Sequence, residues 1–585
     1  MRHRILAALL LGTVVACSRS TTPPPAQSGA AGNVEDRIKT MADRFLDEYL
    51  ERNPEAVTFY GIPGHRHDRL TDNSLAARDT WRALEDQWQR DLAAVQPPAS
   101  GTTAGTYATH REVIEAAIGT RPCEYELWPV SQMQGWHTGY GYLVTIQPVG
   151  TAEARQDALT RWGALPKYLD TEVANLREGI KRGYTAPKRN VQIVIGEIKT
   201  LVEMPAATNP FASPATRDSD QAFKDAYLAL FNDQMLPAMR RYLAFLENEY
   251  LAAARTATPV TANPQGEACY QASIRNWSST KRTPQEVHDI GRREMDALVT
   301  EMKAIGTKLF GTADIPTVMQ RLRTDKKYLF KSREELLAYS RAALVRAKAA
   351  APQAFNVMPK ADVTIEPYPA FRERSAPGEY NPPSEDGKRP GLFYISAYDA
   401  TKKSRAEDES TAFHETIPGH HFQIALAVEN RRTHPISRYF INSGFSEGWG
   451  LYAERLADEM HLFTDDVDRL GMLSSQAWRA GRLVVDTGLH ALGWSREQAI
   501  EYLVAISPQS REAVAAEVDR YIIMPGQATA YMLGRIEIQA ARDDAKKAMG
   551  ERFDLKAFHD RVLEDGGVPL AYLREKVAAW SRAGS

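Results

Sequence analysis

The segment FHETIPGHHFQ, residues 413–423, holds the residue types of a zinc hydrolase in an altered spacing. In a His-Glu-x-x-His helix the two histidines lie one turn apart and converge on one ion, while the glutamate faces the water that the ion activates. Here the next histidines after His414 come six and seven residues later, at His420 and His421. On an unbroken helix His420 would point roughly 120° away from His414, and His421 would lie about 10 Å along the axis. A regular helix therefore predicts no metal site.

Pro418 and Gly419 change this expectation because a regular helix cannot run through them. Pro418 lies four residues after His414, where it cannot donate the hydrogen bond that the His414 carbonyl would accept, and its ring crowds that carbonyl. Gly419 adds backbone freedom. We predict that residues 416–419 bulge out and that His420 re-enters where a second ligand is needed. A solvated helix end rich in histidine is the alternative interpretation.

A third protein ligand is expected, because catalytic zinc keeps three protein ligands and one open position. The segment NSGFSEGWGLYAERLADEM has helical periodicity and carries Glu447 and, seven residues later on the same face, Glu454. Glu447 lies 33 residues after His414, which suits a return by the next helix.

A second helical segment, WRAGRLVVDTGLHALGW, places Arg482, Asp486 and His490 at four-residue steps along one stripe. In one interpretation Arg482 or Arg479 receives a substrate carboxylate, and Asp486 orients His490 as a metal-supporting or proton-transfer group. In the other, the stripe is a salt-bridge ladder between packed helices. The residues alone leave both interpretations open.

The elements that would position these residues are mainly helices. Most of the chain after Val34 consists of amphipathic segments with apolar residues at three- and four-residue steps, and one of them has Thr283 and Glu286 in the positions of a capping box. Residues 361–399 differ, because the flanks ADVTIEPYPAF and LFYISAY are β-branched and aromatic around a connector rich in Pro and Gly. We predict a mainly α fold with a small sheet before the His-Glu segment. The strand LFYISAY is either core or an edge that pairs with an extended peptide.

The amino terminus has the pattern of an exported lipoprotein. Basic residues precede an apolar run from Ile5 to Ala16 that is too short for a stable membrane span. The residues that end at Cys17 fit a bacterial lipobox, with an ordinary signal peptide as the alternative. We therefore predict a signal peptide over 1–16, a lipid anchor at Cys17, a disordered tether over 17–33 and a single catalytic domain over 34–585. Ser18 after the cysteine resembles lipoproteins sent to the outer membrane, so we expect the periplasmic face of the cell envelope.

The charge composition limits the possible partners, and the cysteine count leaves the presence of a disulfide undecided. With 72 Lys and Arg against 74 Asp and Glu, the chain carries no charge excess that would draw it to nucleic acid, so we predict no such partner. Cys123 and Cys269 remain once Cys17 is set aside. A disulfide between them is possible in an oxidising compartment, but the sequence does not decide it.

Four motifs in this order, HETIPGHH, GFSEGWGLYAE, RLVVDTGLH and PGQATAYMLG, resemble a bacterial lipoprotein family of unknown function with the signature H-E-T-x-P-G-H-H. The resemblance covers essentially all of the mature chain. That family is similar to the mainly helical zincin metallopeptidases, which include thimet oligopeptidase, angiotensin-converting enzyme and the thermostable carboxypeptidases. In these a glutamate ligand follows on the next helix, and dipeptidyl peptidase III has one extra residue between its histidines.

The resemblance implies a zincin-like fold, zinc as the cofactor and a role for each residue of the motif. His414 and His420 would be ligands, Glu447 the third ligand and Glu415 the general base on a zinc-activated water. His421 departs from the pattern of the relatives and stands as the alternative to His420. The expected reaction is hydrolysis of peptide bonds in short peptides. Whether the protein cuts near the amino end, near the carboxyl end or inside the peptide stays open.

Relatives also stabilise the tetrahedral oxyanion with a downstream tyrosine, which implies Tyr531, with Arg535 one turn on as a substrate-binding candidate. A buried helix tyrosine with a satisfied hydroxyl is the alternative.

Two other functions are possible interpretations of the sequence. One is a lipoprotein that binds a metal without catalysis. The other is a serine hydrolase, because Ser446 lies in a G-x-S-x-G match and Asp486 and His490 follow it.

Overall fold

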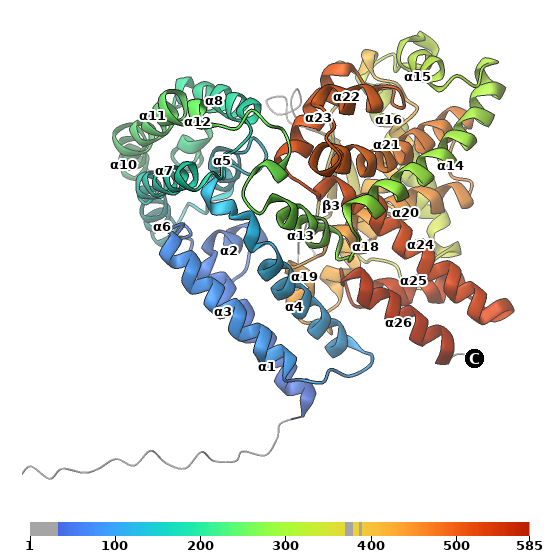
Figure 1. Cartoon of the computed structure of the whole chain (residues 1–585), viewed down its shortest axis with the longest axis horizontal. Coiled ribbons are helices and arrows are strands. Elements are labelled where there is room, and N and C mark those ends of the chain that lie inside the picture. The colour runs from blue at the N-terminus through green and yellow to red at the C-terminus, as the bar shows by residue number, and fades with distance from the viewer. Residues whose placement is uncertain (1–32, 369–377, 385–388, 584–585) are drawn as a thin grey trace, which may run out of the picture.

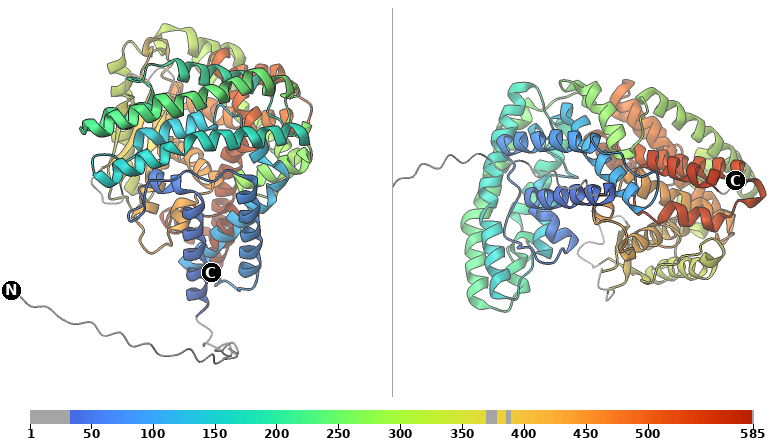
Figure 2. Two further views of the ribbon diagram at one scale, coloured as in Figure 1. Left: turned by 90° about the vertical axis from the view of Figure 1, so that its left-hand side faces the viewer. Right: turned by 90° about the horizontal axis from the view of Figure 1, so that it is seen from below.

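The computed structural model describes residues 33–368, 378–384 and 389–583. It is mainly helical, with 71% helix and one small sheet, which confirms the predicted fold class at this level. Helices α1 to α12 form one half of the molecule, and α14 to α26 with the sheet form the other (Figures 1 and 2). Helix α13 contacts α4 in the first half and both α20 and α24 in the second.

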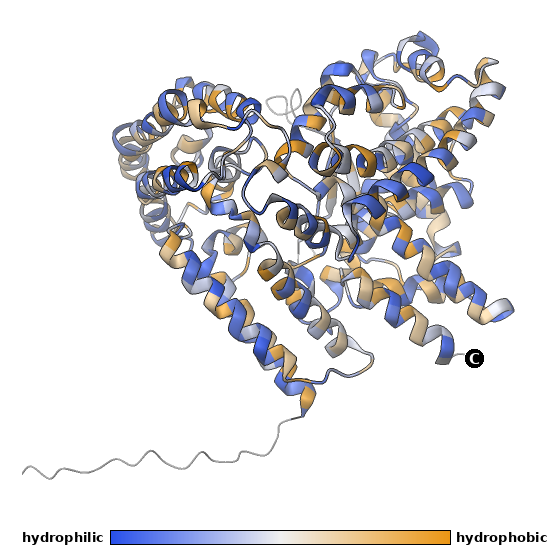
Figure 3. Cartoon of the chain, in the orientation of Figure 1, coloured by the Kyte–Doolittle hydropathy of each residue, from blue (hydrophilic) through white to orange (hydrophobic). Residues whose placement is uncertain are grey.

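The first half is built from antiparallel and crossing helices, many of them amphipathic. Its helices are α1 (Val34–Arg52), α2 (Pro54–Tyr60), α3 (Leu75–Ala93), α4 (Thr102–Gly119), α5 (Trp136–Ile146), α6 (Ala152–Gly163), α7 (Leu165–Arg182), α8 (Lys188–Glu203), α9 (Ser213–Arg217), α10 (Gln221–Leu230), α11 (Leu236–Phe245) and α12 (Leu251–Ala253). In Figure 3 the outer helices α1 and α3 carry both hydrophilic and hydrophobic residues along their length, as the periodicity predicts.

The second half contains every residue of the predicted metal site. Its helices are α14 (Pro284–Phe310), α15 (Ile315–Thr324), α16 (Arg333–Ala350), α17 (Asp408–Glu415), α18 (His420–Glu429), α19 (Ile436–Tyr439), α20 (Ser443–Glu459), α21 (Asp466–Ala491), α22 (Arg496–Val504), α23 (Arg511–Ile523), α24 (Ala530–Met549), α25 (Leu555–Leu563) and α26 (Leu570–Ala583), and α13 (Gly266–Ser278) contacts both halves. Helix α14 begins with the predicted capping box, in which Thr283 and Glu286 each accept a hydrogen bond from the other's backbone.

The sheet has three strands, β1 (Val363–Pro367), β2 (Glu379–Asn381) and β3 (Gly391–Ile395), in the order β1-β3-β2. β3 pairs parallel with β1 and antiparallel with β2. The two predicted strands are present, but the sequence missed β2, which lies inside the connector. Because β3 is the central strand, it offers no free edge for a peptide, which decides between the two interpretations of LFYISAY in favour of a core strand. The edge strand that contributes to the site is β2.

Helix α20 lies between the elements that carry the other site residues. It contacts α17, α18 and α21, and it packs against α24 with the two backbones touching. A Cβ atom added at Gly534 would lie 1.8 Å from the carbonyl oxygen of Gly444, and one at Gly448 would lie 2.4 Å from the carbonyl carbon of Gly534. Only glycine at these crossings permits the observed separation of the two helices.

Two further features complete the frame. Cys123 and Cys269 form a disulfide, which ties the first half to α13 and decides the pairing that the sequence left open. Within the described residues, none of the helices combines the length and the apolar composition needed to cross a bilayer. The predicted signal peptide, the lipidation site Cys17 and nearly all of the tether lie outside the described residues.

Candidate metal centre

The helix that carries His414 breaks where the sequence predicts. Helix α17 ends at Glu415 and α18 begins at His420, so residues 416–419 form a loop between them. The Gly419 N–H donates to the Phe413 carbonyl over 3.0 Å, and the indole N–H of Trp449 on α20 donates to the Pro418 carbonyl over 2.9 Å. The loop is therefore held by backbone and side-chain bonds, and it returns His420 to the same side as His414.

His414, His420 and Glu447 bring their ligand atoms together at this break. One ligand atom from each of the three residues lies within 4.8 Å of the others. The Nε2 atoms of His414 and His420 lie 3.6 Å and 3.5 Å from the same oxygen, Oε2 of Glu447, and the two imidazole rings are nearly perpendicular with centroids 4.7 Å apart. Two imidazoles and one carboxylate are the donor set of a His₂Glu catalytic zinc site.

A second carboxylate, Glu454, supports His414 from behind. Its Oε1 lies 2.8 Å from Nδ1 of His414, and its Oε2 accepts a hydrogen bond of 2.8 Å from Gln476. Burial alone would lower the pKa of His414, but hydrogen bonds to Glu447 and Glu454 raise that pKa to about 9. A carboxylate on the outer nitrogen fixes the ring so that Nε2 faces the centre, as in many metal sites. The sequence placed Glu454 on the face of Glu447 but gave it no role.

His421, the alternative second ligand, faces away from this cluster. Its Nε2 donates to the Ala361 carbonyl over 3.0 Å, and its Nδ1 accepts from the Tyr380 hydroxyl over 3.0 Å. Burial is the main reason why its pKa falls to about 4, so the ring is neutral with both nitrogens engaged. This corrects the prediction that left His421 among the metal ligands, because adjacent helix residues point about 100° apart.

The cluster opens into a cavity of about 630 Å³ that is lined from both halves of the molecule. The lining includes Glu415, Tyr531, Tyr380 of β2 and Met133 from the loop before α5. Glu415, the predicted base, directly follows His414 and borders the same space. The site is thus a cavity in which the carboxylate of Glu415 lies beside the candidate metal-ligand cluster of His414, His420 and Glu447.

Tyr531 lines the same cavity. Burial, followed by the negative charge of Glu447, raises its pKa, so its hydroxyl stays protonated at neutral pH. The guanidinium carbon of Arg482 lies 4.6 Å from the centre of its ring. A protonated hydroxyl beside the cluster is the group that could donate to an oxyanion.

Arginines form the wall of the cavity beside Tyr531. Arg479 and Arg482 of α21 and Arg520 of α23 all line it, together with Glu517. Glu517 accepts hydrogen bonds from Arg482 over 3.1 Å and from Arg520 over 2.9 Å. Although burial alone would raise the pKa of Glu517, the two guanidinium groups lower it to about 2. Sequence reasoning singled out Arg479 and Arg482 but missed Arg520 and Glu517, which no spacing pattern links to α21.

His490 does not line the cavity, which corrects its prediction as a catalytic group. Its Nδ1 accepts from the Val260 N–H over 3.0 Å, and its Nε2 donates to the Tyr521 carbonyl over 3.0 Å. Burial lowers its pKa to about 4. Its neutral ring joins two distant backbone segments, and with both nitrogens engaged it cannot serve Ser446 as the base of a triad. Ser446 borders the cavity as part of α20.

Arg535 is likewise placed outside the cavity lining. It forms an ion pair with Glu294 of α14, and its Nε lies 3.2 Å from the sulfur of Met532. This corrects its prediction as a substrate-binding residue, because the Arg535 guanidinium is engaged by Glu294 of α14 and does not line the cavity.

Asp486, the middle residue of the predicted stripe, is a buried acid. It accepts hydrogen bonds from the Tyr270 hydroxyl over 2.6 Å and from the Gly526 N–H over 3.0 Å, and burial is the main cause that raises its pKa to about 7. Between about pH 4 and pH 7, Asp486 is ionised in the unfolded chain but still protonated in the folded protein. The free energy of unfolding therefore falls as pH rises through this range.

Asp486→Asn is expected to remove this dependence. From pH 5 to pH 8, the loss of unfolding free energy should be smaller by about 2 to 3 kcal/mol in the variant than in the wild type, because the amide keeps both accepted bonds and never ionises. Urea unfolding at the two pH values measures the difference. Equal losses in both proteins would contradict the assignment.

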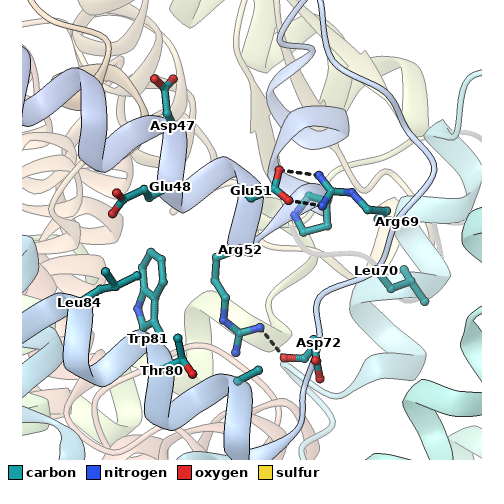
Figure 4. Close-up of a pocket in the computed structure, with 12 residues that line it drawn as sticks. Asp47, Glu48, Glu51, Arg52, Arg69, Leu70, Asp72, Thr80, Trp81 and Leu84 are labelled. Atoms are coloured by element: carbon teal, nitrogen blue, oxygen red, sulfur yellow. Dashed lines mark hydrogen bonds and ion pairs between the residues drawn. The ribbon is translucent and has the colours of Figure 1, made fainter. Parts of the chain in front are cut away.

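A second hollow, of about 800 Å³, lies between α1 and α3 in the first half. Figure 4 shows two interactions among its lining residues: Arg69 pairs with Glu51, and Arg52 donates to the Asp72 carbonyl. Its described lining contains no histidine or cysteine. This hollow therefore offers no catalytic group comparable to the metal-ligand cluster.

Comparisons with known proteins support the fold and leave the activity open. The family model described as "Bacterial protein of unknown function (DUF885)" matches residues 54–577. The structure is similar to that of a candidate lipoprotein from Colwellia psychrerythraea, with a TM-score of 0.84 and 25% identity over 94% of this chain and 99% of that one. It is also similar to a candidate lipoprotein of unknown function from Shewanella oneidensis, with a TM-score of 0.76 and 17% identity over 92% and 98%. No curated protein matches the chain.

Proposed function

This chain belongs to the bacterial family DUF885, whose function is unknown, and we propose that it is a zinc-dependent hydrolase of peptide bonds in short peptides. The convergence of His414, His420 and Glu447, with ligand atoms within 4.8 Å of one another in the lining of a cavity, carries the proposal. Three protein ligands leave an open position, which is the arrangement of catalytic rather than structural zinc. The chain would then be a distant relative of the helical zincins, with the second histidine displaced by the loop at residues 416–419.

The three candidate ligands and their hydrogen-bond partners fit a zinc ion. Both histidines present Nε2 to one point, the carboxylate of Glu447 completes the set, and Glu454 holds the outer nitrogen of His414. The Nδ1 of His420 is buried without a partner among the described residues. Burying this nitrogen unpaired costs free energy, which zinc bound at Nε2 of the same ring would offset.

The residues of the chain divide the work of hydrolysis among them. Zinc, when bound, supplies the positive charge that acidifies a water and polarises the scissile carbonyl. Glu415 accepts the proton of that water and later delivers it to the leaving amine. Tyr531 donates a hydrogen bond from its hydroxyl to the oxyanion as negative charge develops there. Met133 and Tyr380 line the cavity from the other half and from β2, and a cavity walled from several sides favours short peptides over folded proteins.

Metal removal tests the proposal. The purified protein should contain about one zinc per chain, hydrolyse peptides from a mixed library, lose this activity with a chelator and recover it with added zinc. A protein that binds zinc but hydrolyses no peptide would instead support the non-catalytic metal-binding function. A protein whose peptide hydrolysis survives complete metal removal would contradict the zinc mechanism, and inhibition by a serine reagent would then favour Ser446.

Glu454→Gln is expected to weaken zinc binding about 10- to 100-fold, because the neutral amide orients His414 but no longer raises its basicity. Competition with a fluorescent chelator measures the affinity. Glu459→Gln is the matched control, since Glu459 lies on the same helix, is exposed and pairs with Arg542. Equal zinc affinity in the two variants would show that Glu454 does not support the site.

The same proposal includes attachment to the cell envelope through Cys17. The two similar structures are described as candidate lipoproteins, which supports it. Cys17→Ser should move the protein from the membrane fraction to the soluble periplasmic fraction without loss of specific activity. An unchanged distribution would contradict lipid anchoring at this residue.

A further inference from the structure

We infer that the arginine wall binds the terminal carboxylate of the peptide, so that the protein removes residues from the carboxyl end. The inference rests on the proposed function and deepens it, because it selects one class of substrate. Its basis is a pair of guanidinium groups in the cavity, Arg479 and Arg482, with hydrogen-bond donors that no described residue uses.

Arg482 is held in place by the protein yet keeps one donor free. Its Nε donates to the Tyr521 hydroxyl over 2.8 Å and its Nη2 to Glu517 over 3.1 Å. Its Nη1 is buried without a hydrogen-bond partner, and the residue is only 8% exposed. A buried charged donor left unpaired costs free energy that an anionic ligand would recover.

Arg479 lies one turn before Arg482 on α21 and forms no ion pair within the described part of the chain, although its charge acts on the buried carboxylates Glu407 and Glu454. Its Nη1 donates to the carbonyl and hydroxyl oxygens of Ser475, and its Nε is buried without a partner. Two guanidinium groups three residues apart on a helix face the same side. Together they offer the paired donors that a carboxylate accepts.

The charges of the arginine wall also favour binding of a terminal carboxylate. Glu517 is the carboxylate of this wall, and Arg482 and Arg520 already share it. Glu415 and Glu447 line the same cavity, and a divalent ion bound at the cluster would balance their charge. The wall therefore keeps a positive excess, which a neutral stretch of peptide backbone would leave uncompensated and a terminal carboxylate would neutralise.

The position of the wall sets where the bond is cut. The cavity holds both the metal-ligand cluster and the arginines within about 630 Å³, the size of a pocket for a small ligand. A peptide whose carboxylate is bound by Arg479 and Arg482 can place only a bond near its carboxyl end at the cluster. Products should therefore keep the original amino terminus.

The test compares each peptide with its carboxyl-terminal amide. For the wild type, amidation should lower kcat/KM about 10- to 100-fold, the effect of losing charge-assisted hydrogen bonds. In Arg479→Met, cleavage of the free acid should fall while cleavage of the amide stays the same, and Arg479→Lys should restore part of the preference. Arg469→Met is the matched control, because Arg469 lies on the same helix outside the cavity and pairs with Asp458.

A binding measurement separates this inference from the proposed function. Zinc-loaded Glu415→Gln protein should bind an alanine tripeptide more tightly than its amide in calorimetry, and Arg479→Met in that background should remove the difference. If the wild type hydrolyses no peptide, the proposed function fails, and the calorimetry still decides whether the arginine wall binds a terminal carboxylate. Equal binding and cleavage of both forms would overturn it. A preference that follows an acidic side chain and ignores amidation would also overturn it, because the wall would then bind that side chain.

Discussion

Glu415→Gln should lower peptide hydrolysis by about 10²- to 10⁴-fold while zinc stays bound. The glutamine keeps the size of the side chain but cannot accept a proton from the water. His414, His420 and Glu447 are unchanged, so the metal-ligand cluster should keep its geometry. The measurements are kcat/KM on a cleaved peptide and the zinc content per chain.

The variant separates catalysis from metal binding, which few other substitutions at the site would do. Glu429→Gln serves as its control, since Glu429 ends α18 and binds the backbone N–H groups of Lys360 and Ala361. Loss of activity together with loss of zinc would mean that Glu415 is a ligand or a structural group. Full activity with zinc bound would remove Glu415 from the mechanism.

Replacing the two adjacent histidines one at a time should give opposite results. His420→Ala removes an Nε2 that lies 3.5 Å from Glu447, so zinc affinity should fall by more than the 10- to 100-fold that loss of an outer partner costs. His421→Ala removes bonds to Ala361 and Tyr380 only, so zinc should remain bound with nearly wild-type affinity.

Each variant is the control for the other, because the substitutions are chemically identical and differ by one position. Zinc content after dialysis and the unfolding midpoint with and without zinc are the readouts. Zinc lost from His421→Ala and kept by His420→Ala would overturn the assignment of the second ligand. Such a result would require the loop at residues 416–419 to fold differently from the structure described above.

Local chemistry explains why the sequence predicted the centre of the site. The break depends on Pro418, which cannot donate to the His414 carbonyl in any context. The choice between His420 and His421 could not be made this way, because it depends on how far the loop rotates α18. That rotation is set by bonds from distant residues, such as the one from Trp449 to the Pro418 carbonyl.

The periphery of the site was harder to predict because it depends on contacts between segments far apart in the chain. His490 has the residue type of a catalytic group, and only the backbone of Val260 and Tyr521 shows that it is structural. Arg520 joins the wall because α23 packs beside α21, which periodicity does not reveal. β2 was missed because three residues inside a connector rich in Pro and Gly carry almost no strand signal.

The glycine contacts between α20 and α24 have a consequence for motion. Glu447 lies on α20 and Tyr531 on α24, and the two backbones touch at Gly444, Gly448 and Gly534. No side chain lies between them at these points that could change rotamer and let the helices slide. Any opening of the cavity must therefore move lining residues outside these two helices, such as Met133, while the proposed third ligand and the proposed oxyanion donor move as one rigid unit.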